Sequence, residues 1–99
     1  MLTDEQLRQN ELNRAANAEQ ILKNPLVQEV LDSLEREIVT AWEVTPMRDQ
    51  EAREKAWMFY VTVRKFRNIF QSYIETGRMA SLQLEEKRRS GIFKVFGGS

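Results

Sequence analysis

Turn-forming residues are scarce in this chain, and their scarcity limits the possible folds more than any other feature. The 99 residues include only four Gly and two Pro. A sheet protein of this length needs many short strands separated by turns, whereas a few long helices need very few breaks. We therefore expect an all-α protein.

Composition narrows the possible functions. The chain is 41% apolar and 30% charged, too hydrophobic to be wholly disordered, and short enough for one domain. Cys and His are both absent, which removes disulfides, thiol nucleophiles, the usual zinc ligands and the imidazole of most acid–base mechanisms. We predict a protein that is not an enzyme, needs no cofactor or metal and takes no small-molecule substrate.

The N-terminal segment gives no sign of export. Residues 1–10 are polar and acidic and lack the basic and then apolar pattern of a secretory signal. No apolar run approaches the roughly 18 residues of a membrane span. We expect no membrane association and a location inside the cell that makes the protein.

Capping residues mark the start of a first helix. Thr3 and Gln6 form the pattern of a capping box, in which each side chain bonds the backbone amide of the other residue. The helix is predicted to run to about Lys23. Its apolar stripe is weak and rich in Ala, so it depends on tertiary packing.

A second helix is bounded by proline. Asn24 can cap a helix whose first residue is Pro25, because proline there gives up an amide that had no partner. Thr45 precedes Pro46 and is pushed out of the helical region, so the helix should stop there. Apolar residues recur on one face at a spacing of three and four.

A third helix is predicted to begin after the cap residue Asp49 and to end at Gly77, a frequent helix stop. The short connector makes the second and third helices antiparallel neighbours. Residues 78–89 either form another helix or continue the third, and the sequence leaves both open.

The expected fold is an antiparallel helical hairpin of two long helices, with an N-terminal helix and a short C-terminal helix. We expect residues 1–91 to form a single helical domain, followed by an apolar C-terminal tail over residues 92–99.

Charge is divided unevenly along the chain, although 15 basic and 15 acidic residues cancel overall. Residues 1–56 hold 12 acidic and 7 basic side chains, and residues 57–99 hold 3 acidic and 8 basic ones. Such a division can guide association between copies or present a basic end to an acidic partner. An intramolecular hairpin that neutralises itself is an equal alternative.

Aromatic side chains spread around more than half of the third helix, more than a two-helix hairpin can cover. Large uncovered apolar areas on a small domain usually mark an interface, and Tyr and Trp are favoured anchors there. The alternative is a monomeric bundle in which the first and last helices fold back over these rings. The predicted protein-interaction residues on this helix are Trp57, Tyr60, Phe66, Phe70 and Tyr73.

The C-terminal tail is a second candidate. Ile92, Phe93 and Phe96 lie in a short apolar segment behind a basic stretch, as in docking peptides that add a strand or fill a groove. The tail could equally pack on its own hairpin.

A small cationic cluster could contact the phosphates of nucleic acid. The total charge of zero and the lack of a recognised motif argue against a dedicated nucleic-acid domain, and cations near a helix C-terminus are also ordinary partners of the helix dipole. The candidate contacts are Arg78, Lys87, Arg88, Arg89 and Lys94.

The stretch AWEVTPMRDQEAREKAW at residues 41–57 resembles a pattern found in small bacteriophage-encoded helical proteins. The segments RAA at 14–16, LKNPL at 22–26 and ETGRMA at 75–80 fit the same outline, so the resemblance covers about residues 14–80. It implies a gene among those for virion assembly, a role as head accessory or scaffold-like factor, and a location in the host cytoplasm and in the virion or procapsid. It implies no catalytic or binding residues.

Together these observations predict a non-enzymatic phage structural or assembly protein. Its expected partners are further copies of itself, as a homo-oligomer, and a phage structural protein engaged by the tail. One alternative is a small nucleic-acid-associated packaging or regulatory factor. Another is an inhibitor that binds a host protein through the acidic face of the second helix.

Overall fold

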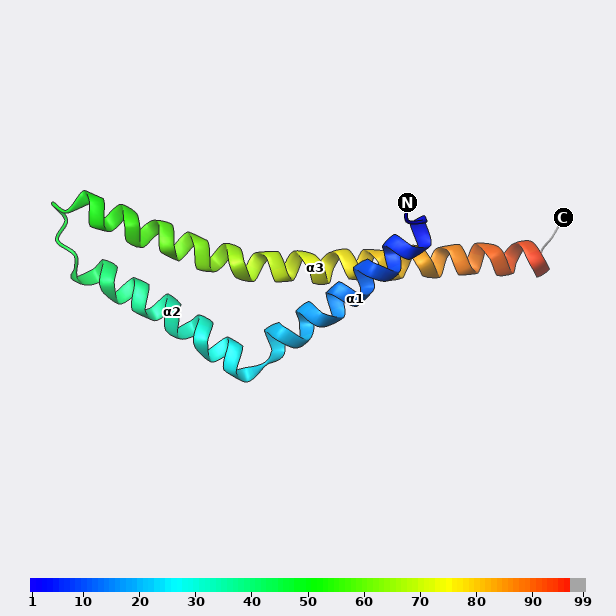
Figure 1. The fold of residues 1–99 in the computed structure, drawn as a ribbon, viewed down its shortest axis with the longest axis horizontal. Coiled ribbons are helices and arrows are strands. Elements are labelled where there is room, and N and C mark those ends of the chain that lie inside the picture. The colour runs from blue at the N-terminus through cyan, green and yellow to red at the C-terminus, as the bar shows by residue number, and fades with distance from the viewer. Residues whose placement is uncertain (97–99) are drawn as a thin grey trace. The chain divides into compact units, whose positions relative to one another are not determined.

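The computed structural model describes the backbone of residues 1–96 and the side chains of residues 1–91. It contains three α-helices, α1 (Asp4–Lys23), α2 (Pro25–Val44) and α3 (Gln50–Phe96), shown in Figure 1. Residues 1–96 contain no strand. The prediction of an all-α protein is confirmed.

Reciprocal hydrogen bonds hold the start of α1. The Gln6 amide donates to the Thr3 hydroxyl oxygen at 3.2 Å, and the Thr3 amide donates to Gln6 Oε1 at 2.9 Å. This is the predicted capping box, and the end of α1 at Lys23 also agrees with the sequence.

Side chains and prolines likewise set the limits of α2. Asn24 Oδ1 accepts a hydrogen bond from the Leu26 amide at 2.9 Å, and Pro25 is the first residue of the helix. Thr45 is extended, with φ −78° and ψ 127°, directly before Pro46. Both boundaries were predicted, because local sterics and caps determine them.

Helix α3 begins as predicted and ends elsewhere. Asp49 Oδ1 accepts a hydrogen bond from the Ala52 amide at 3.1 Å. The prediction that the helix stops at Gly77 is wrong, since α3 continues through this residue to Phe96. Within residues 1–96 no glycine has a positive φ, so Gly77 does not adopt the left-handed conformation of a helix end. Residues 78–89 therefore continue α3 and do not form a separate short helix.

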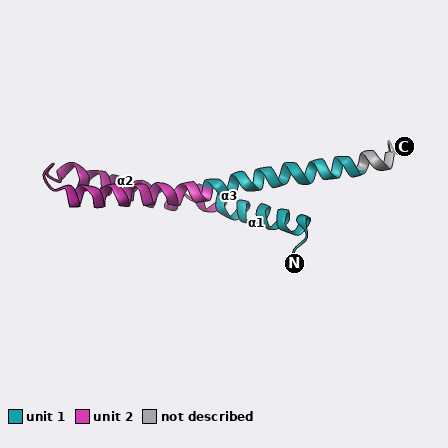
Figure 2. Ribbon diagram, turned by 90° about the horizontal axis from the view of Figure 1, so that it is seen from above, with its two compact units in different colours: residues 1–19, 71–99 teal, residues 20–70 magenta. Residues whose placement is uncertain are grey.

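The chain divides into two compact units, coloured in Figure 2. The first comprises residues 1–19 and 71–99, so it joins most of α1 to the later part of α3. Its buried residues are all small: Ala15, Ala18, Gly77 and Ala80. Small side chains allow two helix backbones to approach closely, and the core of this unit is such a contact.

The second unit, residues 20–70, pairs α2 with the first part of α3. Leu31 is its buried hydrophobic residue among those described. Val27, Ile38 and Val63 of the same unit are half-buried. Burying one Leu contributes roughly 1.5–3 kcal/mol, a small amount for a pair of helices this long. The unit thus leaves many of its large apolar side chains exposed, among them Leu26, Val30 and Phe66.

Candidate interaction surface

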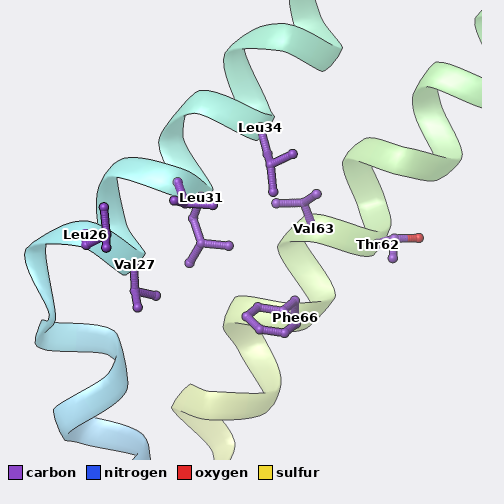
Figure 3. A pocket seen from close by; sticks show the side chains of 8 residues that line it. Leu26, Val27, Leu31, Leu34, Thr62, Val63 and Phe66 are labelled. Atoms are coloured by element: carbon purple, nitrogen blue, oxygen red, sulfur yellow. The ribbon is translucent and has the colours of Figure 1, made fainter.

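An apolar groove runs between α2 and α3 in the second unit. It has a volume of about 440 Å³ and is lined by Leu26, Val27, Val30, Leu31, Leu34, Thr62, Val63 and Phe66. Figure 3 shows Leu31 and Leu34 of α2 reaching toward Val63 of α3 across the gap. Only a threonine hydroxyl interrupts an otherwise hydrocarbon lining, so the groove is suited to another apolar surface.

The helical repeat explains why the groove stays open. Leu26, Val30 and Leu34 are four residues apart and form one ridge, while Val27 and Leu31 form the next ridge on the same side of α2. Helix α3 covers the second ridge and leaves the first at the surface, with Leu26 65% and Val30 50% exposed. The apolar stripe of α2 is wider than one neighbouring helix can cover.

A second hollow adjoins the connector between the two helices. Ala41 of α2 and Phe59 of α3 are among its lining residues, together with the charged side chains of Glu37 and Lys55. Phe59 is largely exposed. We use the term apolar face for the groove and this hollow together.

The other side of the α2–α3 pair is charged. A shallow depression there is lined by Asp32, Glu35, Arg36, Val39, Thr40, Glu43 and Tyr60. Arg67 of α3 binds two of these carboxylates, with Nη2 2.7 Å from Asp32 Oδ1 and Nε 3.0 Å from Glu35 Oε1. The unit is therefore amphipathic as a whole, with a charged side and an apolar face.

The two ion pairs favour the charged form of Arg67. Partial burial lowers the pKa of its guanidinium, but hydrogen bonds to Asp32 and Glu35 outweigh that effect and leave the pKa above its ordinary value. The acidic side of α2, considered above as a surface for a host protein, is thus partly neutralised by α3.

The connector is fastened by Arg53. Its guanidinium lies 4.4 Å from the centroid of the Trp42 ring and donates a hydrogen bond from Nη1 to the Thr45 carbonyl at 3.2 Å. Trp57 lies instead beside Tyr60, with ring centroids 6.4 Å apart. Trp42 and Trp57, the two tryptophans of the stretch 41–57, thus have structural contacts at this end of the helix pair.

The predicted aromatic interaction residues do not share one face. Phe66 lines the groove and is 49% exposed, with Phe70 packed edge-on against it at 5.1 Å. Tyr60 lines the charged side, and its neighbour Trp57 is 63% exposed. Tyr73 belongs to the other unit. It is half-buried under the guanidinium of Arg14, 4.2 Å from the ring centroid.

The candidate cations whose side chains are described lie on the exposed surface of α3. Arg78 is paired with Glu75 at 2.6 Å, and Arg89 with Glu85 at 3.0 Å. The hydrogen bond from Arg78 lowers the pKa of the Glu75 carboxyl and raises that of Arg78 itself. Two of the candidate phosphate contacts therefore already form ion pairs with carboxylates of the same helix.

Lys87 and Arg88 are exposed as well. The side chains of Lys94 and of the predicted docking residues Ile92, Phe93 and Phe96 lie outside the described residues. The docking role of these residues therefore stays a prediction.

Sequence reasoning focused on α3 and gave too little weight to α2. Three of the eight residues that line the groove are Leu26, Val30 and Leu34, and their spacing of four was visible in the sequence. The sequence did not show which of the two ridges α3 covers, because this depends on where α3 lies.

No helix in the described part of the chain combines the length and the hydropathy that crossing a bilayer requires. The described residues also contain no group of three or more side chains arranged to hold a metal ion. Comparison of the chain with protein-family models, curated proteins and solved structures finds no match.

Proposed function

We propose that this chain is a non-enzymatic assembly protein whose working unit is the antiparallel hairpin of α2 and α3. The hairpin self-associates through its apolar face. The observation that carries this proposal is the exposed groove, with Leu26 and Val30 on one wall and Phe66 on the other. Exposed apolar areas of this kind on a small domain are typical of interaction sites.

Energetics support the same proposal. Burial contributes roughly 25 cal/mol for each Å² of apolar surface removed from water, and Leu31 alone gives the hairpin only a small core. A partner over the groove would remove Leu26, Val30 and Phe66 from water as well. Association is then part of what stabilises the fold, as in oligomers whose subunits lack a sufficient core.

The more specific role in bacteriophage head assembly, as an accessory or scaffold-like factor, draws its support from the resemblance of residues 14–80. In this role the C-terminal segment would engage a phage structural protein.

A deletion of residues 92–99 tests the docking role of the C-terminal segment. We expect self-association to persist and binding to procapsid shells, measured by co-sedimentation, to be lost. Equal co-sedimentation of the full and shortened chains would contradict it.

A pair of matched substitutions tests the self-association. Val30 and Val39 are both exposed valines of α2, but Val30 lines the groove whereas Val39 lines the charged side. Val30→Glu would place a carboxylate in an apolar interface and should weaken association by about a hundredfold or more. Val39→Glu should leave association within about a factor of three.

The measurement is molar mass by light scattering over a range of concentrations, with helix content followed by circular dichroism. The unmodified chain should exceed its monomer mass of 11.7 kDa at tens of micromolar. A strict monomer would refute the proposal, and so would equal effects of the two substitutions.

A further inference from the structure

We draw no further inference here: the strongest candidate, the surface patch of exposed Trp57, Met58 and Phe59 beside the connector between α2 and α3, carries nothing, because nothing in the structure shows what covers it.

Discussion

Gly77 of α3 lies directly against Ala15 of α1, so closely that a Cβ added to Gly77 would overlap the Ala15 Cβ. The same added atom would lie 3.3 Å from the Glu11 carbonyl oxygen and 3.6 Å from the Ala15 Cα. The glycine is therefore required by the contact between the two helices of its unit, although it sits in the middle of α3.

Gly77→Ala should lower the free energy of unfolding by about 1–2 kcal/mol. Overpacking a contact whose atoms cannot rotate away costs about 2–3 kcal/mol, and the better helix propensity of Ala returns about 1 kcal/mol of this. Chemical denaturation followed by circular dichroism measures the change.

Gly91→Ala is the matched control, because an added Cβ there meets nothing within 4 Å. It should leave stability unchanged or raise it by up to about 1 kcal/mol. Ala15→Gly combined with Gly77→Ala should restore the packing of α1, since it removes the overlapping atom. A Gly77→Ala protein as stable as the unmodified chain would contradict the close contact.

Arg67→Met should destabilise the second unit by about 1 kcal/mol, because it removes two ion pairs and leaves the carboxylates of Asp32 and Glu35 close together. The loss should shrink in high salt, which screens the ion pairs of a partly exposed side chain. Urea unfolding at low and high salt measures this. Arg64→Met, which removes a cation near Tyr60, is the control and should change stability by less than about 0.5 kcal/mol. Equal losses of stability in both variants would show that the ion pairs of Arg67 do not stabilise the unit.

The Glu75 carboxyl should titrate below its ordinary pKa, because the hydrogen bond from Arg78 favours its charged form. For a lowered pKa, the stabilisation is present above the ordinary value and is lost as the pH falls through the folded value. Carboxyl chemical shifts measured by NMR between pH 2 and pH 7 report the midpoint. Arg78→Gln should return the midpoint to the ordinary range, and an unchanged midpoint would show that the pair does not form in solution.

Asp49→Ala should cost about 1 kcal/mol of unfolding free energy, because Asp49 Oδ1 caps the first turn of α3 through the Ala52 amide. Asp49→Asn keeps an oxygen acceptor and should retain most of the stability. Thermal unfolding of both variants gives the comparison. If Ala and Asn were equivalent at this position, the cap would contribute nothing measurable.

The sequence alone was sufficient for the helix boundaries that local chemistry sets. These boundaries depend on atoms within a few residues of one another, so their sequence patterns predicted the structure. They are the capping box at Thr3, the cap and proline at Asn24 and Pro25, and the cap at Asp49. The predicted stop at Gly77 failed for the complementary reason. Glycine is permitted both at a helix end and wherever a neighbouring backbone leaves no room for a Cβ, and only the position of Ala15 distinguishes the two uses.

Tertiary structure also decided which apolar residues form the candidate site. The sequence placed Leu31 on the main apolar stripe of α2 and Val30 among the residues that widen it, but it could not show which part of the stripe a neighbouring helix covers. The path of α3 buries Leu31 and leaves Val30 half exposed in the groove. A stripe wider than one helix contact must leave one ridge uncovered, and the neighbouring helix, by where it lies, selects the ridge that remains for a partner.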